Sequence, residues 1–184
     1  LKFHSVAIDP QQYTENYQKL VSANPQVQFA YGRLRISDKY FLEQATLNYF
    51  TKTDENPMPL VQQPSKNAEV RRIVFRGSVD NEYCKRLRWD LESSLNKVSP
   101  YAVCSRNEIL AEQAALIENK DSNSTDLLHE YFIPKQHLAA FIQDLKLILK
   151  DSKVDLLNIT IREIQQDQDA FMSYAREDVF GLVF

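Results

Sequence analysis

Glycine is scarce in this sequence: Gly32, Gly77 and Gly181 are the only three among 184 residues. Loops that hold nucleotide phosphates need several closely spaced glycines, because the backbone must approach the anion without side chains in the way. The three glycines are isolated, which excludes both a P-loop and the glycine-rich fingerprint of a Rossmann fold. This chain cannot bind a nucleotide by either route.

Cysteine and histidine are also scarce. The two cysteines, Cys84 and Cys104, cannot form a disulfide framework. Together with His4, His129 and His137 they do not give the ligand spacing of a zinc site. We therefore expect reduced, structural thiols and no metal.

Neither sign of charge dominates the sequence, and no long apolar run is present. Lys plus Arg is 22 and Asp plus Glu is 25, so the formal net charge is −3. This balance disfavours a general nucleic-acid binder, which needs a basic surface. No segment approaches the roughly 20 apolar residues that span a bilayer, and the N-terminus is not a basic-then-apolar leader. The sequence predicts a soluble, cytoplasmic protein, with peripheral membrane association left open.

Apolar strand patterns stand at both ends of the sequence. Residues 1–8 alternate from the first position, and residues 178–184 are rich in β-branched and aromatic side chains. The length and the 43% of hydrophobic residues fit one folded domain. We expect residues 1–184 to be a single domain that belongs to a longer polypeptide.

Strand and helix patterns follow the same order in the first and last thirds of the chain. Asp9 and Pro10 begin one helix, and Pro134 begins another, whose apolar spacing is the strongest helical pattern in the sequence. Strands are expected at residues 1–8, 27–37, 40–51, 126–133, 154–164 and 179–184, and a short helix at 168–175. The order predicts an α+β fold, a large antiparallel sheet of duplicated ferredoxin-like (β-α-β-β) units with helices on one face.

Residues 53–125 interrupt this order as a loop and helical insert. Three prolines make residues 53–67 a loop. Asp80 is expected to cap a helix, and Ser105 with Glu108 forms a capping box before the next one. The apolar face of the first helix consists of Tyr83, Leu87, Leu91 and Leu95.

Six basic residues gather in this insert, and they allow two interpretations. They can meet a membrane surface or a partner, or they can form a solvated helix face balanced by nearby acids, which we favour. The basic residues are Arg71, Arg72, Arg76, Lys85, Arg86 and Arg88, and the acids are Glu69, Asp80, Glu82 and Asp90.

The strand predicted around residue 160 offers the best candidate site. Leu157, Ile159 and Ile161 form one apolar face, which we expect beneath the helices. The opposite face carries three hydrogen-bonding side chains, Asn158, Thr160 and Arg162. Arg162 would offer a planar donor fork to a carboxylate, phosphate or hydroxyl pair. The alternative is a solvated sheet face without a ligand.

Three other charged residues allow the same choice between function and surface. Glu130 can be an acid, a base or a partner of Arg162, or it can belong to a surface ion pair of little energetic weight. Arg33 and Arg35 share a strand face, where they either form ion pairs across the sheet or extend the candidate site.

Four segments of the second half carry a resemblance to a known family. They are Ser105-Arg106-Asn107-Glu108, residues 129–134 (HEYFIP), residues 156–162 (LLNITIR) and residues 174–180 (YAREDVF). They resemble the substrate-binding or cap region of FAD-dependent oxidases of the vanillyl-alcohol-oxidase type. Within that superfamily the similarity is to bacterial FAD-linked oxidoreductases such as alditol oxidase and decaprenylphosphoryl ribose oxidase. It is most specific over residues 104–184.

The resemblance implies a function. In such enzymes a separate domain of the same polypeptide binds FAD, and the cap domain closes the cavity in which an alcohol substrate passes a hydride to the flavin. By this resemblance the chain would be such a cap domain, inactive without the FAD-binding domain. No cofactor-binding motif carries over to these residues.

The resemblance also implies site residues, with one departure. Arg162 corresponds to an arginine that contacts substrate in alditol-oxidase-like members, and Glu130 to a polar residue that faces the cavity. Those members have an acidic residue two positions before the arginine, where this sequence has Thr160. The departure puts polyol specificity in doubt.

A second interpretation does not depend on the resemblance. The chain would be a stand-alone ferredoxin-like binding or interaction module without catalysis, whose sheet pairs with a partner or another copy. A reading frame that continues upstream into a glycine-rich, flavin-binding domain would favour the first interpretation.

Overall fold

We describe the protein from a computed structural model, over residues 1–54, 68–98, 103–110 and 117–184. Nothing is described of the side chains of Leu95 and Glu108, so their predicted roles fall outside the described part of the structure, as does nearly all of the predicted loop over 53–67.

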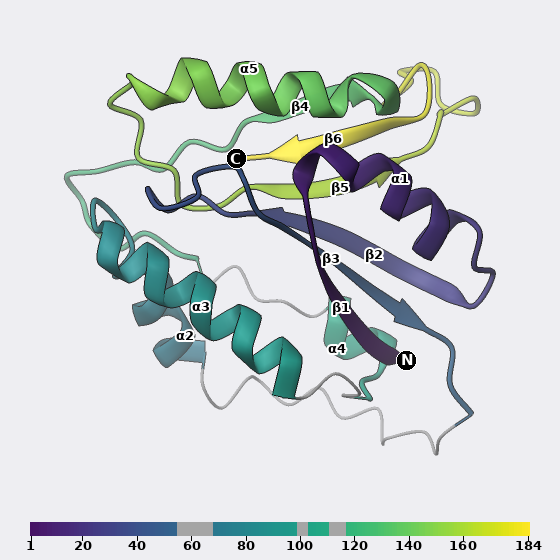
Figure 1. The fold of residues 1–184 in the computed structure, drawn as a ribbon, viewed down its shortest axis with the longest axis horizontal. Helices are drawn as coiled ribbons and strands as arrows, with labels where there is room; N and C mark the ends of the chain where they lie inside the picture. Colours follow the sequence, from purple (N-terminus) through teal and green to yellow (C-terminus); the bar gives the residue numbers. More distant parts are fainter. Residues whose placement is uncertain (55–67, 99–102, 111–116) are drawn as a thin grey trace.

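One antiparallel sheet of six strands, in the order β1-β3-β2-β5-β6-β4, forms the centre of the described fold (Figure 1). The strands are β1 (Lys2–Ile8), β2 (Val27–Leu34), β3 (Ala45–Thr51), β4 (Glu130–Pro134), β5 (Thr160–Ile164) and β6 (Val179–Val183). The predicted α+β class with a large antiparallel sheet is confirmed.

The two halves of the sheet repeat one arrangement. In each half a strand, a helix and two strands follow one another, and the last strand lies between the first two. The pairing of β2 with β5 joins the halves. The description of each half as a ferredoxin-like unit stays a prediction.

Two helices, α1 (Tyr13–Tyr17) and α5 (Leu138–Lys150), cover one face of the sheet (Figure 1). Asp9 accepts a hydrogen bond from the Gln11 amide at 2.9 Å, so the predicted helix start is confirmed. The core lies between these helices and the sheet. Its fully buried residues include Tyr13, Leu138, Ile142, Ile159, Ile161, Phe180 and Leu182.

Gly32 has a specific role in this core. A Cβ at this position would stand 2.2 Å from the hydroxyl oxygen of Tyr13 and 2.5 Å from its ring. The tyrosine ring therefore occupies the space that any other residue at position 32 would need.

The insert adds helices α2 (Ala68–Arg76), α3 (Glu82–Val98) and α4 (Arg106–Leu110). Helix α3 lies on the face of the sheet opposite α1 and α5, a placement that the sequence did not predict (Figure 1). Arg33 faces α3, while its neighbour Gly32 faces Tyr13 of α1. Residues alternate between the two faces of a strand, so the helices lie on opposite sides. No helix within the described residues is long and apolar enough to cross a membrane.

Several predicted boundaries are wrong. The connection between β2 and β3 runs over residues 35–44, because buried Arg35 organises a loop there through its side chain. Residues 126–129 and 154–159 were expected to be part of strands, but β4 begins at Glu130 and β5 at Thr160. Residues 168–175 form no helix, because Asp167 binds the backbone amides of Asp169, Ala170 and Tyr174 in a closed loop.

The start of α3 also differs from the prediction. The side chain of Asn81, not that of Asp80, accepts a hydrogen bond from a backbone amide of the first turn, that of Cys84, at 3.0 Å. Asp80 has a positive φ of 48°, and its amide donates to Asp155.

Candidate functional site

The predicted platform residues lie on the face expected for them. Ile159 and Ile161 are completely buried beneath α1 and α5. Thr160 and Arg162 alternate with them along β5 and therefore face the other way. Asn158 lies on the same side as Thr160, to which its amide donates a hydrogen bond of 2.8 Å.

Helix α3 covers the first part of this platform. Arg33 donates hydrogen bonds to Asn158 at 2.8 Å and to Glu92 of α3 at 2.6 Å. Asn158 and Thr160 are thereby held in a network beneath the helix. Because their polar groups already have partners, these two residues position Arg33 and α3 and are not an open binding surface.

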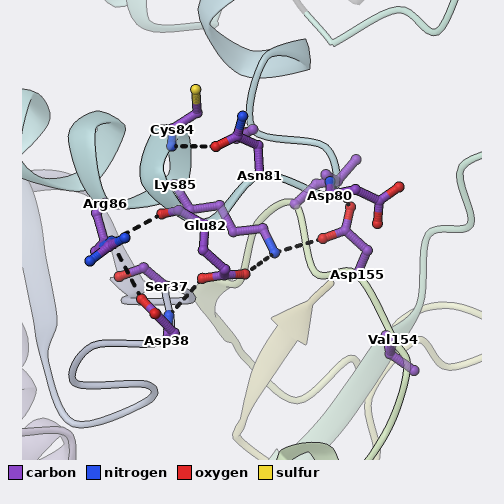
Figure 2. Close-up of polar contacts among 12 residues, drawn as sticks. Ser37, Asp38, Asp80, Asn81, Glu82, Cys84, Lys85, Arg86, Val154 and Asp155 are labelled. Atoms are coloured by element: carbon purple, nitrogen blue, oxygen red, sulfur yellow. Dashed lines mark hydrogen bonds and ion pairs between the residues drawn. The ribbon is translucent and has the colours of Figure 1, made fainter.

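Buried cations attach α3 to the rest of the protein. Lys85 is buried and contacts Glu82 at 2.7 Å and Asp155 at 2.6 Å, as Figure 2 shows. In the same view Glu82 also accepts a hydrogen bond from the backbone amide of Asp38 at 2.7 Å, and Asp38 lies 3.5 Å from Arg86. These contacts join the start of α3 to two loops that are distant in sequence.

Two further arginines continue this polar interface. Arg88 of α3 is buried, and it donates to the Ser78 hydroxyl at 2.7 Å and to the Leu157 carbonyl. Burial and the neighbouring Arg33 lower the pKa of Arg88 to about 10, so its guanidinium stays charged at neutral pH. Arg35, also buried, lies 3.6 Å from Asp90 of α3. The interpretation of the basic residues as a merely solvated helix face is therefore wrong for Lys85 and Arg88.

The second part of the platform is not covered in this way. Arg162 of β5 lies opposite Gly181 of β6, which in turn lies opposite Phe132 of β4. Arg162 is exposed, and it forms no hydrogen bond or ion pair with any residue that the structure describes. An arginine, a glycine and an aromatic residue thus form one row across the uncovered half of the sheet.

Glu130 lies at the edge of this row, but it does not pair with Arg162. It accepts a hydrogen bond of 2.7 Å from the hydroxyl of Tyr174, and this contact raises the pKa of Tyr174. The positive charge of Arg162 opposes that rise. The ring of Tyr174 also packs edge-on against Phe132, with centroids 4.9 Å apart.

The loop that carries Tyr174 is held firmly in place. Asp167 accepts hydrogen bonds from three backbone amides of the loop, and these bonds lower its pKa. The Gln166 side chain and amide bind Arg176 and Asp178 near the other end. This fixed loop borders a depression of about 320 Å³, whose wall on the sheet side is Phe132, Pro134 and Val179.

Three residues of this site were not predicted from the sequence, namely Phe132, Tyr174 and Gly181. The alternation in β4 already placed Phe132 on the same face as Glu130, which was the available signal. A lone glycine inside a strand pattern was a second signal, because it marks a close approach to the backbone. The contact of Tyr174 depends on the loop fold and left no local signal.

No family model, curated protein or solved structure matches this chain. Within the described residues, no three His, Cys, Asp or Glu side chains gather where they could hold a metal ion.

Proposed function

We propose that this chain is the substrate-binding domain of a FAD-dependent oxidoreductase that oxidises an alcohol. Its partners would be a small-molecule alcohol and the FAD-binding domain of the same polypeptide, without which it is inactive. The observation that carries the proposal is the uncovered half of the sheet, where Arg162, Gly181 and Phe132 stand side by side. The resemblance of residues 129–134, 156–162 and 174–180 to cap regions supports it, because these segments supply the same surface.

The uncovered row fits the substrate side of a flavin site. A Cβ on Gly181 would stand 2.6 Å from Cδ1 of Ile164 and 3.1 Å from Oε1 of Glu130. Gly181 therefore lets the side chain of Ile164 pack directly over the strand backbone. The chain has no glycine-rich loop for the phosphates of FAD, so residues outside this chain must bind most of that cofactor.

In this proposal the flavin supplies the hydride acceptor and the chain supplies orientation. When bound, FAD would supply the acceptor for a hydride from the carbon that bears the substrate hydroxyl, and Glu130 would take up the hydroxyl proton. Arg162 fixes one end of the substrate through its planar donors. Glu130 accepts a hydrogen bond from a hydroxyl group, and Phe132 with Tyr174 excludes water from that side. Asn158 and Thr160 support the sheet beneath α3.

The test uses the complete reading frame that encodes this chain. The purified protein should contain flavin, visible in its absorbance spectrum. Arg162→Ala should lower kcat/KM by about 100-fold, because misplacing a substrate costs rates of that order, while the flavin content stays unchanged. Lys153→Ala, which removes an exposed charge elsewhere, serves as the control. A complete protein that neither contains flavin nor binds added FAD would overturn the proposal.

The exposed apolar side of the insert favours a second candidate, the interaction module without catalysis. Helices α2 and α3 direct six large apolar side chains to solvent, each at least 44% exposed. They are Val70, Ile73, Val74, Tyr83, Leu87 and Leu91. If this face mediates association, the Leu87→Glu variant should have a lower sedimentation coefficient than the wild-type protein at the same high concentration. An unchanged coefficient would remove this candidate.

A further inference from the structure

Strand β4 forms one edge of the described sheet, and only β6 pairs with it. His129 and Phe184, just outside the two strands, exchange two backbone hydrogen bonds of 2.9 and 3.4 Å. Such pairs alternate along an antiparallel ladder, so Tyr131 also bonds to β6, whereas the N–H and C=O groups of Glu130 and Phe132 point away from it. Within the described residues, these outward groups have no hydrogen-bond partner.

Large apolar side chains line this edge. Edge strands of natural proteins are usually protected by charges or covered by other segments, because their free backbone groups can pair with another strand. Here four large apolar side chains between residues 127 and 132 are exposed, and a fifth comes from the loop that contacts Phe132. They are Leu127 (75%), Leu128 (72%), Tyr131 (44%), Phe132 (39%) and Tyr174 (56%).

The exposed apolar surface of this edge is of the size that a dimer interface needs. A large side chain has about 200 Å² of surface, so the exposed fractions of these five residues correspond to an area on the order of 500 Å². A standard protein interface buries about 800 Å² on each partner. The edge residues alone would therefore supply more than half of that area.

The free edge is also complementary to a second copy of itself. When two copies of β4 lie antiparallel with Tyr131 opposite Tyr131, Glu130 of each copy lies opposite Phe132 of the other. The outward N–H and C=O groups of these two residues then all form hydrogen bonds across a two-fold axis. In the same register Leu128 lies opposite Pro134 of the second copy, and both side chains point to the same face of the sheet.

We infer that β4 is the interface of a homodimer, in which the sheets of two copies join edge to edge into one antiparallel sheet. A second copy is favoured over an unrelated extended segment by the exposed area and by the two-fold match of donors and acceptors. The interface uses the backbone of Glu130, so its side chain keeps the contact with Tyr174. The inference goes beyond the proposed function and does not depend on it.

The first test measures the association of the protein. Sedimentation velocity over about a hundredfold range of concentration should show a monomer that converts to a dimer. Leu128→Lys places a charge on the edge and should raise the dissociation constant of the dimer about tenfold or more. Leu147→Lys is the matched control, because Leu147 lies on the outer side of α5 and is 69% exposed. It should leave the dissociation constant unchanged.

The second test locates the two-fold axis. Residues opposite each other in a non-hydrogen-bonded pair have Cα atoms about 4.5 Å apart, which is within the range of a disulfide. In a protein whose Cys84 and Cys104 are replaced by serine, Tyr131→Cys should form an intermolecular disulfide under mild oxidation. Leu147→Cys in the same background should not. Circular dichroism must show that the variants are folded.

Three results would overturn the inference. The first is a wild-type protein that stays monomeric at every concentration. The second is a dimer that Leu128→Lys leaves intact and Leu87→Glu disrupts, which would place the contact on the insert. The third is a complete polypeptide that is monomeric, in which another part of the same polypeptide covers β4. If the dimer forms as expected but the complete protein lacks flavin, the dimer stands and the oxidoreductase proposal fails.

Discussion

Helices α5 and α3 cover opposite faces of one sheet, and they contact it with opposite sides of their amphipathic patterns. Helix α5 places Leu138 and Ile142 in the core, at 0% and 1% exposure. Helix α3 turns Lys85 and Arg88 inward and leaves Leu87 44% exposed. Apolar burial attaches the first helix, and charged hydrogen bonds attach the second.

The difference shows that an amphipathic pattern does not determine which side of a helix faces a sheet. The surface beneath α5 is apolar, so the apolar stripe faces it. The surface beneath α3 contains Arg33, Arg35 and Asp155, which need charged or polar partners. Polar residues of α3 supply them, and the apolar stripe is left outside.

Truncating an apolar side chain should give the largest difference in unfolding free energy between a variant of α5 and a variant of α3. Ile142→Ala in α5 should lower the free energy of unfolding by about 2–5 kcal/mol, because it leaves a cavity in the core. Leu87→Ala in α3 should change it by less than about 0.5 kcal/mol, as at other surface positions. Urea unfolding of both variants measures this. Equal losses would mean that the stripe of α3 is buried after all.

Removing the buried guanidinium of Arg88 should instead weaken the attachment of α3 and leave α5 unchanged. Arg88→Met should cost about 1.5–3 kcal/mol, because the Ser78 hydroxyl and the Leu157 carbonyl lose a charged donor. Arg86→Met, which removes a partly exposed arginine from the same helix, should cost less than about 1 kcal/mol. Hydrogen exchange should show faster opening of α3 amides in the first variant, with α5 unaffected. Faster exchange in α5 as well would contradict a separate attachment of the two helices.

The two strand glycines offer a comparison of the two faces themselves. Gly32→Ala should destabilise the protein by about 1–3 kcal/mol, because its Cβ meets the packed ring of Tyr13. Gly181→Ala meets only the terminal methyl group of Ile164 and a carboxylate oxygen of Glu130 on the uncovered face, and a change below about 1 kcal/mol is expected. Thermal unfolding of both variants gives the result. A larger loss at position 181 would show that the uncovered face is as tightly packed as the core.

Mild acid should have the smallest effect and should act on β1. Burial and then the charge of Lys2 lower the pKa of His4, so its neutral form is favoured in the folded state. The resulting stability is present above the ordinary histidine value of about 6.5 and is lost as the pH falls below it, by about 1 kcal/mol or less. Unfolding midpoints on both sides of that pH should differ less in His4→Gln than in the wild type. An identical pH dependence in both would rule out His4 as the source.

Sequence patterns predicted the features that depend only on residues close together along the chain. The spacing of Leu138 and Ile142 predicted α5 and its buried face, and the alternation around Ile161 predicted which side of β5 carries Arg162. These signals need only a residue's own neighbours along the chain.

The remaining errors come from contacts between distant positions. The inward face of α3 depends on Arg33 and Asp155, each more than 50 residues away from its partner. The contact of Tyr174 with Glu130 spans 44 residues and replaces a predicted helix with a loop. Of the candidate site residues, Asn158 and Thr160 lie beneath α3, whereas Arg162 and Glu130 are exposed. No local pattern contains that distinction.

The ring of Tyr13 above Gly32 gives this protein an internal optical reporter. The Tyr13 hydroxyl is buried and has no hydrogen-bond partner among the described residues, and burial raises its pKa well above the ordinary value. Its neighbour Tyr17 responds in the same direction, through burial and through Glu163. Because their pKa values are raised, we expect the tyrosinate absorbance of Tyr13 and Tyr17 in an alkaline titration to appear only when α1 leaves the sheet. The ultraviolet spectrum can thus record, without any label, when this layer of the fold opens.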